Sequence, residues 1–397
     1  MNHNFAFALT TTYLHTDVPR LVEMASSQKV MSALHPSQVT AIYNIKAQAA
    51  TLKPEALKNI YHIFRMSNIP AGRLDDIRET IIQHARVALH FHPDRPSRSG
   101  RTVVESLLED GKYRNQFETG ISNGLVATQL GGARDGWERS LFSGAYHDSG
   151  NSDAVAKTFD PTLRPKYGAL DLMRNSDGPA PRFGSCYFLL RPEVSSRSTF
   201  TYGGSQAVPK ERGTADEFDG ILAALLEECF TRDTALGVEN IRPKKMVEYI
   251  DALSKSPLVE DIYKRLPSRN LDHLIEAQIH GDVLLSRDVE ALVVDPSFFM
   301  RGSTGPLLQA LGQTYGFPIF VHYGFQLSSD NVPSDFRGPT MPSLAARIAL
   351  NGIIDVQVIG EAVRDLVAGV DLLGDKGDLS EALQELKLLW HVLVRYG

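Results

Sequence analysis

Apolar residues recur at helical spacing along the first part of the chain. The stretch "HPSQVTAIYNIKAQAATL" places Ser37 where an N-cap is expected, and "PEALKNIYHIFRMSN" opens with Pro54. Serine at the N-cap and proline in the first turn are both typical of helix starts. The stretch "PAGRLDDIRETIIQHA" repeats the helical spacing. The pattern predicts a helical segment over residues 1–85, whose role is packing.

The spacing changes at residue 86, where the apolar residues begin to follow the pattern of β-strands. Strands are predicted in "RVALHFHP", "GSCYFLLRPE", "RSTFTYGG", "DHLIEAQIHGDV", "DVEALVVDPSF" and "FPIFVHYG". Helices are predicted in "RTVVESLLEDGKY", which Gly111 ends, and in "DEFDGILAALLEECF". Residues 331–397 return to mostly helical spacing, with one apolar stripe along the last helix. The pattern therefore predicts an α+β core over residues 86–330, flanked by helical N-terminal and C-terminal segments.

The composition is that of an ordinary globular protein. Of the 397 residues, 43% are hydrophobic and 22% are charged, and the net charge is -6. This charge, with lysines and arginines scattered along the chain, argues against a nucleic-acid partner. No apolar run is long enough to predict a membrane span, and the N-terminus lacks the basic start of a signal peptide. The two cysteines, Cys186 and Cys229, fit a reducing compartment better than a disulfide framework.

The stretch "HFHPDR" is the first candidate for chemistry, and it allows two interpretations. His90 and His92 are two residues apart on a predicted strand, so both could bind one metal ion on the same face. A hydrolase of the amidohydrolase kind needs further ligands, for which His280, His322 and Asp295 are candidates. The regular strand–helix spacing that would bring these residues together is missing.

The second interpretation of this stretch is a phosphate site. Arg95 follows the predicted strand, and a guanidinium there can bind a phosphate through two parallel hydrogen bonds. His92 could donate to a ribose hydroxyl or to a phosphate oxygen. The alternative is that Arg95 pairs with Asp94 or Asp75 on the surface.

Polar residues crowd the loop-like stretch "YRNQFETGISNG". A loop that only connects two elements rarely needs so many directional side chains, so this stretch could form the polar wall of a small-molecule pocket. The alternative is a turn whose side chains cap its own backbone. The residues concerned are Arg114, Gln116, Glu118, Thr119, Ser122 and Asn123.

A late strand carries the second acidic candidate. Glu276 and Gln278 share one strand face, which His280 continues. A buried carboxylate is costly without a partner, so Glu276 is either exposed at an edge or part of a site.

Hydroxyl-bearing and aromatic residues complete the set of candidates. Ser198, Thr199 and Thr201 could orient a carboxylate, or could be present for their strand propensity alone. Tyr167 and Tyr202 could stack on an aromatic ring of a ligand, although such tyrosines more often belong to the core or its rim.

Taken together, "HFHPDR", "QFETGISNG", "KYGAL", "RFGSCYF" and "EAQIHGDV...DVEALVVDPSF" resemble a bacterial effector-type family of the ADP-ribosyltransferase superfamily, one first catalogued as a domain of unknown function. The resemblance covers roughly residues 85 to 300. It implies a split, two-sheet α+β core with NAD in the cleft between the sheets. It also implies a reaction in which ADP-ribose moves from NAD to an acceptor and nicotinamide is released.

The resemblance also suggests roles for individual residues. Glu276 matches the late-strand carboxylate that stabilises the ribosyl cation, while Gln278 departs from the second acid of the usual pattern. Glu118, in a Gln-x-Glu arrangement, is a competing acid, and both acids are expected to face the site. Arg95 and His92 are expected to hold the phosphates or ribose of NAD. The other residues assigned to NAD are His90, Arg114, Gln116, Thr119, Ser122, Asn123, Tyr167, Ser198 and Thr199, with Tyr202 as a second candidate for stacking.

The predicted function is thus mono-ADP-ribosylation of a protein, on an arginine side chain, with NAD as co-substrate and no metal. A metal-dependent hydrolase built on His90 and His92, and an inactive module that binds NAD or a partner, are the alternatives. No membrane partner is predicted, and the sequence specifies no oligomeric state. The expected location is the cytoplasm, or a host cell reached by a secretion system that needs no signal peptide.

Overall fold

The computed structural model describes residues 33–97, 100–120, 129–147, 160–255, 265–370 and 378–397. Its α-helices are α2 (Pro36–Met66), α3 (Arg73–His84), α4 (Val103–Asp110), α5 (Gln116–Thr119), α6 (Ala133–Leu141), α7 (Asp219–Arg232), α8 (Pro243–Ala252), α9 (Leu285–Asp288), α10 (Ser297–Met300), α11 (Thr304–Tyr315), α12 (Met341–Ile348), α13 (Val356–Val367) and α14 (Leu379–Tyr396). Short 3-10 turns include η1 (Pro161–Leu163), η2 (Pro181–Phe183), η3 (Pro192–Arg197) and η4 (Ser205–Ala207).

Within the described residues, one large mixed sheet has the order β12-β11-β4-β1-β3-β9-β5-β6. Its strands are β1 (Arg86–Phe91), β3 (Lys166–Asp171), β4 (Cys186–Leu190), β5 (Ser198–Tyr202), β6 (Arg212–Thr214), β9 (Ile275–Ile279), β11 (Val289–Val294) and β12 (Ile319–Val321). Small two-stranded sheets pair β2 (Lys112–Tyr113) with β10 (Val283–Leu284), β7 (Thr234–Ala235) with β8 (Val238–Glu239), and β13 (Gln326–Ser328) with β14 (Ile353–Asp355). The predicted mixture of helices and strands is confirmed, whereas the expected pair of core sheets is a single large sheet in the described residues.

The large sheet consists of two halves that meet at a short junction. β1 pairs with β3 only over Arg86–Asp171, Val87–Leu170 and Ala88–Ala169. Beyond Ala88, β1 continues beside β4 through Phe91, whereas β3 continues beside β9 through Lys166. The end of β1 therefore leaves the neighbourhood of β3.

Side-chain alternation gives the two faces of the sheet different characters. Phe188 and Phe200 belong to the main apolar core, which fills one face. The opposite face carries Tyr187 next to Ala88, and, on the other half of the sheet, Glu276 and Gln278. The polar candidates on β9 thus lie on the face away from the main core.

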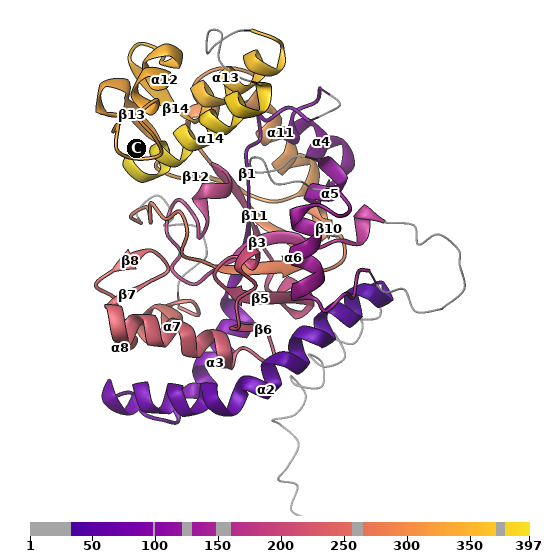
Figure 1. The fold of residues 1–397 in the computed structure, drawn as a ribbon, viewed down its shortest axis with the longest axis vertical. Helices are drawn as coiled ribbons and strands as arrows, with labels where there is room; N and C mark the ends of the chain where they lie inside the picture. Colours follow the sequence, from indigo (N-terminus) through magenta and orange to yellow (C-terminus); the bar gives the residue numbers. More distant parts are fainter. Residues whose placement is uncertain (1–32, 98–99, 121–128, 148–159, 256–264, 371–377) are drawn as a thin grey trace, which may run out of the picture.

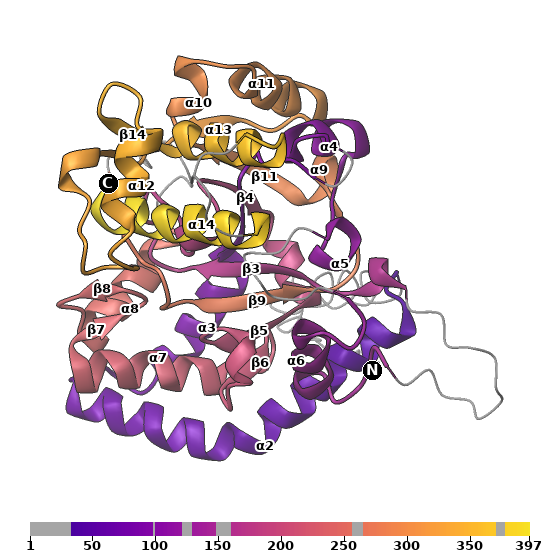
Figure 2. The ribbon, with the colours of Figure 1, turned by 45° about the horizontal axis from the view of Figure 1, so that its top comes forward.

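Helices gather at the two ends of the molecule (Figure 1). α2, α3, α7 and α8 lie at one end, and α12, α13 and α14 lie at the other, with the large sheet between them. The turned view in Figure 2 gives the same arrangement and sets α14 above β3 and β9.

The N-terminal helices differ in detail from the prediction. His35, rather than Ser37, is the N-cap of α2, and its backbone N–H donates to the side chain of Gln38 over 3.0 Å. Pro54 lies inside α2 and does not start a new helix. An interior proline costs a helix about 3 kcal/mol. The buried face of α2, which includes Ile45 and Ile60 and packs beside α7, offsets this cost.

Two contacts illustrate how the C-terminal helices are held against the core. Asp94, just after β1, lies against Gly360 in the middle of α13. The indole Nε1 of Trp390 in α14 donates to the carbonyl of Arg182 in η2 over 3.1 Å. The pairing of β13 with β14 also crosses residue 330, where a domain boundary was predicted.

Both cysteines are free and buried, Cys186 on β4 and Cys229 on α7, as the sequence predicted. Burial raises the pKa of the Cys229 thiol to about 12. Among the described helices, none combines the length and apolar character that a membrane crossing requires.

The contact between α13 and Asp94 predicts that a glycine-to-alanine change inside a helix will lower the free energy of unfolding. Replacing glycine with alanine inside a helix normally stabilises a protein by up to about 1 kcal/mol. At Gly360, however, the added Cβ would lie 1.5 Å from Oδ2 of Asp94. Gly360→Ala should therefore lower the free energy of unfolding by about 1–3 kcal/mol, measured by urea denaturation. Gly136→Ala, inside α6, is the control, because nothing lies within 4 Å of its added Cβ. A Gly360→Ala variant as stable as the original chain would contradict this packing.

Candidate functional site

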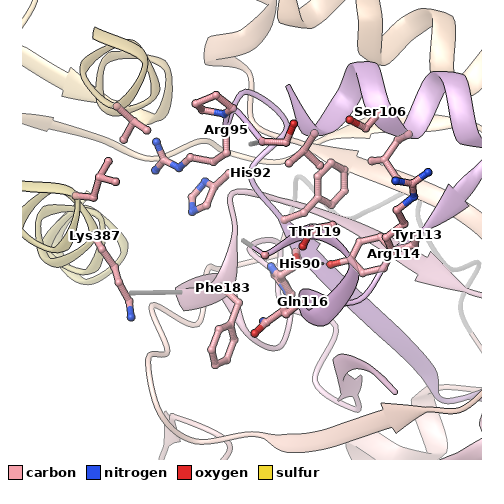
Figure 3. A pocket seen from close by; sticks show the side chains of 18 of the residues that line it. His90, His92, Arg95, Ser106, Tyr113, Arg114, Gln116, Thr119, Phe183 and Lys387 are labelled. Atoms are coloured by element: carbon pink, nitrogen blue, oxygen red, sulfur yellow. Dashed lines mark hydrogen bonds between the residues drawn. The ribbon is translucent and has the colours of Figure 1, made fainter. Parts of the chain in front are cut away.

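A cavity of about 450 Å³ opens where β1 ends. The residues that follow β1 form one wall, and α4, β2 and α5 form the next. η2, α13 and α14 complete it, so elements from both predicted core and predicted C-terminal segment meet here. Figure 3 draws Arg95 and Lys387 projecting from different elements into this space.

Many of the residues predicted to bind NAD line this cavity. They are His90, His92, Arg95, Arg114, Gln116 and Thr119. Sequence reasoning missed other residues that also line it, namely Tyr113, Arg182, Phe183, Gln384, Lys387 and Trp390. Phe183 stands within "RFGSCYF", a stretch used only for the family resemblance, and nothing in the sequence pointed to α14.

His90 has a structural role in the described conformation. Its Nδ1 donates to the carbonyl of Gly184 over 2.9 Å, and its Nε2 accepts from the backbone N–H of Ala180 over 3.2 Å. The ring also stacks on Tyr187, with centroids 4.9 Å apart. Burial lowers the pKa of His90 to about 3, so the ring is neutral. Both nitrogens are taken by backbone groups, which leaves His90 with neither a donor for NAD nor a lone pair for a metal.

Arg95 brings a charge into the cavity that the described side chains do not fully satisfy. Its Nη1 is buried without a hydrogen-bond partner. Burial lowers the pKa of Arg95, and the neighbouring Asp94 opposes this shift. Asp94 is itself only 2% exposed, and neither of its carboxylate oxygens has a hydrogen-bond partner among the described residues. The alternative of a surface ion pair between Arg95 and Asp75 is not found, and Asp75 pairs with Arg78 on α3.

Four of the buried polar atoms without partners among the described residues belong to residues that line this cavity. They are Nη1 of Arg95, Nε of Arg182, Oε1 of Gln116 and Oε1 of Gln384. Buried polar groups in folded proteins are nearly all hydrogen-bonded, so such a cluster indicates a missing partner. The two guanidinium N–H groups suit an anionic group of a ligand, whereas the two amide oxygens suit hydrogen-bond donors such as hydroxyl groups.

A second cluster lies on the polar face of the sheet and forms a directed chain of hydrogen bonds. Tyr146 donates to Nδ1 of His280 over 2.5 Å, and Nε2 of His280 donates to Thr199 over 3.2 Å. The Thr199 hydroxyl donates to Oε1 of Gln278 over 2.9 Å, and Nε2 of Gln278 donates to Oε1 of Glu276 over 3.0 Å. The direction is fixed because a carboxylate can only accept and a hydroxyl has one proton. We call this chain the Glu276 relay.

The relay holds a buried carboxylate in one orientation. Glu276 is 7% exposed, and it also accepts from the backbone N–H of Ser205 over 3.2 Å. Burial raises the pKa of Glu276, and the hydrogen bonds from Ser205 and Gln278 oppose that shift. Its burial excludes the exposed strand edge, which was one of the two alternatives that the sequence left open. Glu276 is not among the residues that line the cavity.

Alternation along β5 separates the predicted hydroxyls and aromatics. Thr199 lies opposite Gln278 on the polar face, whereas Ser198 and Tyr202 point to the other face. Ser198 donates to the carbonyl of Val194 over 2.9 Å, and Tyr202 donates to Glu228 of α7. The predicted roles of Ser198 and Tyr202 at the same site as Glu276 are therefore wrong.

Tyr167 lies on the polar face, where α6 supplies partners that the sequence did not reveal. Its hydroxyl donates to Glu138 over 2.7 Å, and the guanidinium of Arg134 lies 4.9 Å from the centre of its ring. Glu138, only 1% exposed, also accepts from Arg164 over 2.8 Å. One face of the Tyr167 ring is thus occupied by Arg134. The only sequence signal for this group was two acids three apart, Asp135 and Glu138, on a single helix.

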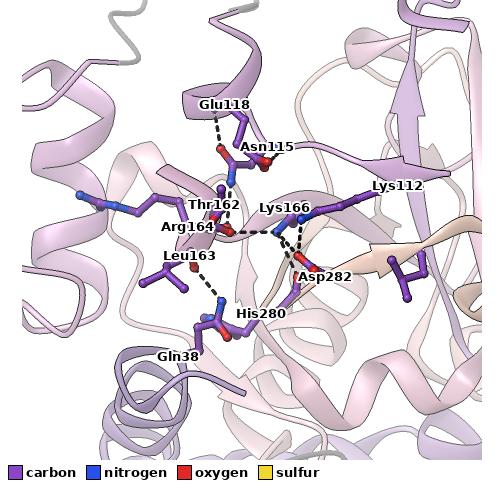
Figure 4. Close-up of polar contacts among 12 residues, drawn as sticks. Gln38, Lys112, Asn115, Glu118, Thr162, Leu163, Arg164, Lys166, His280 and Asp282 are labelled. Atoms are coloured by element: carbon purple, nitrogen blue, oxygen red, sulfur yellow. Dashed lines mark hydrogen bonds and ion pairs between the residues drawn. The ribbon is translucent and has the colours of Figure 1, made fainter. Parts of the chain in front are cut away.

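Glu118 is a capping residue of α5. Its carboxylate accepts from the backbone N–H of Asn115 over 2.9 Å, as Figure 4 shows. The Asn115 side chain in turn donates to the carbonyl of Arg164 over 3.1 Å. The side chain of Glu118 does not line the cavity, although Gln116 and Thr119 of the same helix do. The prediction that both acids face one site is therefore wrong for the described conformation.

Lys166 lies close to the same turn, fully buried on β3. Its Nζ donates to the carbonyl of Gly281 over 3.1 Å and lies 3.9 Å from Asp282, which also pairs with Lys112 (Figure 4). Burial lowers the pKa of Lys166 to about 8. These contacts fasten β3 to the end of β9.

Two further predicted residues, Ser122 and Asn123, lie outside the described residues.

Residues 86–396 match a protein family described as "Protein of unknown function (DUF3626)". The chain belongs to this family. The match carries no assignment of activity, and it begins at the first residue of β1. No curated protein matches the chain.

The DUF3626 match continues past the boundary predicted at residue 330, through α12, α13 and nearly all of α14. It therefore includes both halves of the cavity wall. In the described part of this DUF3626 chain, no group of three or more His, Cys, Asp or Glu side chains is placed to hold a metal ion. Of the metal ligands that the sequence suggested, His322 and Asp295 are 3.9 Å apart, but His322 Nε2 lies 2.8 Å from the carbonyl of Ser185.

The relay predicts how the stability of the DUF3626 chain depends on pH. Burial lowers the pKa of His280 to about 3, against 6.5 for an ordinary histidine. Between these values the unfolded chain binds more protons than the folded one, so the free energy of unfolding falls as the pH decreases. His280→Gln should lessen this fall by about 2 kcal/mol between pH of about 6.5 and 4.5, measured by urea denaturation at several pH values. An unchanged slope in the variant would contradict a neutral His280 in the relay.

Proposed function

We propose that this protein is a mono-ADP-ribosyltransferase that uses NAD as co-substrate and modifies a protein, on an arginine side chain. The proposal rests on one main observation. A cavity lies at the end of β1, and in the described residues Nη1 of Arg95 and Nε of Arg182 are buried there without a hydrogen-bond partner. In the other half of the same sheet, Thr199 on β5 orients Gln278 on β9, which donates to the carboxylate of Glu276. The sequence resemblance to ADP-ribosyltransferases agrees with this pairing of a phosphate-binding element and an oriented late-strand carboxylate.

The chemistry makes few demands on the protein. The bond between C1′ of the ribose and the nicotinamide nitrogen breaks, and its electron pair leaves with nicotinamide. The ribosyl group passes through an oxocarbenium-like state, which a nearby carboxylate stabilises. A nitrogen of the acceptor guanidine then bonds to C1′ and gives up a proton.

In this proposal Glu276 is the carboxylate that stabilises the cation. The Glu276 relay supports it, because each hydrogen bond points toward the carboxylate and favours its charged form. Glu276 also takes the proton from the acceptor nitrogen. Glu118 is the poorer candidate for either role, because its carboxylate is used by the backbone of Asn115.

Arg95 binds the diphosphate of NAD in this proposal, with His92 beside it. The unpartnered Nη1 of Arg95 supports this role, since charged donors make strong hydrogen bonds to phosphate. Gln116 from α5 supplies a second buried polar group for the same ligand. Phe183 offers an apolar ring at the cavity wall for nicotinamide, a role first expected of Tyr167.

The proposal requires NAD to extend from Arg95, which lies beyond the end of β1, to Glu276 on β9, with β3 between these two strands.

A second candidate function is NAD binding without turnover. It is favoured by the burial of Glu276 and by its absence from the cavity lining. In that case the cavity would recognise the dinucleotide and the relay would serve only the stability of the sheet. A metal-dependent hydrolase receives no such support, since both nitrogens of His90 are used by the backbone.

The test is release of nicotinamide from NAD by the purified chain, with a cell lysate as source of acceptor. Glu276→Gln should lower the rate by about 10²-fold or more, because the amide cannot stabilise the cation. Glu118→Gln is the matched control and should keep most of the rate. Equal loss in both variants, or none in Glu276→Gln, would refute the assignment of Glu276. Binding of NAD without any release would favour the second candidate.

A further inference from the structure

One face of α14 borders the cavity. Ser380, Leu383, Gln384 and Lys387 follow the spacing i, i+3, i+4 and i+7, which places them on a single helix face. Trp390 extends this face by one more turn. A helix that merely covers a core presents apolar residues to it, yet two of these positions carry an amide and an ammonium group.

The polar groups of this face lie in surroundings that favour an anion. Burial and the neighbouring cations Arg182 and Arg337 lower the pKa of Lys387 to about 8. An anion placed beside Lys387 would oppose both effects, because it favours the charged ammonium form. Arg182, which lines the same cavity from η2, has its Nε buried without a partner among the described residues.

Gln384 adds a second indication of a ligand. Its Oε1 is buried without a hydrogen-bond partner, although the side chain faces a cavity of about 450 Å³. The side-chain oxygen of Gln116, on the other wall, is also buried without a hydrogen-bond partner. An unpaired buried amide costs free energy, and a polar ligand between the two walls would remove that cost.

We propose that α14 is part of the ligand-binding site, with Lys387 and Arg182 contacting the diphosphate of the dinucleotide and Gln384 hydrogen-bonding to the same ligand. Arg95 and Lys387 then hold the diphosphate from two walls. The identity of the ligand rests on the proposed function, whereas the participation of α14 rests on the geometry. The C-terminal helices would in that case be needed for binding, and would not be an appendage for docking a partner.

Point variants suit the test better than truncation, because Leu386, Leu389 and Trp390 of α14 are buried in the core. Binding of NAD, ADP-ribose, inorganic pyrophosphate and nicotinamide is measured by calorimetry on the full chain. Lys387→Met should weaken the first three by about 10-fold or more, the loss expected for a charged hydrogen bond, and leave nicotinamide unchanged. Lys387→Arg should recover most of the affinity.

The matched control for Lys387→Met is Lys244→Met, on the exposed side of α8. The matched control for Gln384→Ala is Gln313→Ala, at an exposed glutamine of α11. Equal affinities of Lys387→Met and Lys244→Met for all the phosphate-bearing probes would overturn the proposal, even if NAD is turned over normally. Loss of pyrophosphate and ADP-ribose binding in Lys387→Met supports the proposal even if nicotinamide is never released. The experiment therefore distinguishes a failure of the binding role of α14 from a failure of the proposed transferase activity. Absence of binding by any probe would overturn both.

Discussion

The junction between β1 and β3 determines how the rest of the structure is arranged. Only three residue pairs join the two halves of the sheet there, and the strands diverge beyond Ala88. One half carries β1 to the rim of the cavity, and the other carries Glu276 and its relay on β9. A longer junction would have kept the end of β1 paired with β3 and closed the space that α4, α5 and α14 now surround. The short junction is therefore what permits a cavity beside a continuous sheet.

The two polar clusters differ in one physical respect. In the Glu276 relay each donor meets an acceptor, so the group is complete without a ligand and holds its members rigidly. In the cavity, guanidinium and amide atoms are buried without partners. Complete networks serve to orient, whereas incomplete ones bear a cost that a bound molecule can remove. This contrast separates a positioning cluster from a binding cluster without reference to any relative.

Local patterns in the sequence predicted six of the eight strands of the large sheet and missed β3 and β6. The stretches assigned to β1, β4, β5, β9, β11 and β12, and to helices α4 and α7, are confirmed in type. The end of α4 at Gly111 is also confirmed, with the glycine at φ 62°. Such elements follow from the residues within them, and the same alternation could have assigned Ser198 and Thr199 to opposite faces.

Features that depend on contacts between residues far apart in the sequence could not be predicted from such local patterns. The continuation of α2 through Pro54 depends on packing against α7. The buried pair of Glu138 with Arg164 joins α6 to the residue that follows η1, and the pattern predicted neither element. Glu118 illustrates the converse, because its local capping contact with Asn115 uses the carboxylate that a motif had marked for catalysis. The contribution of α14 to the cavity could not be foreseen either, since nothing in its leucine stripe indicates what its other face touches.

The order of the cavity wall along the chain has a consequence for biosynthesis. Residues near position 90 supply the first wall, and residues 380–390 of α14 supply the last. A chain still on the ribosome has β1 and most of the large sheet outside the exit tunnel well before α14 emerges. The cavity is thus completed only after α14 has emerged, so a nascent chain that has already formed its sheet cannot yet hold a ligand there.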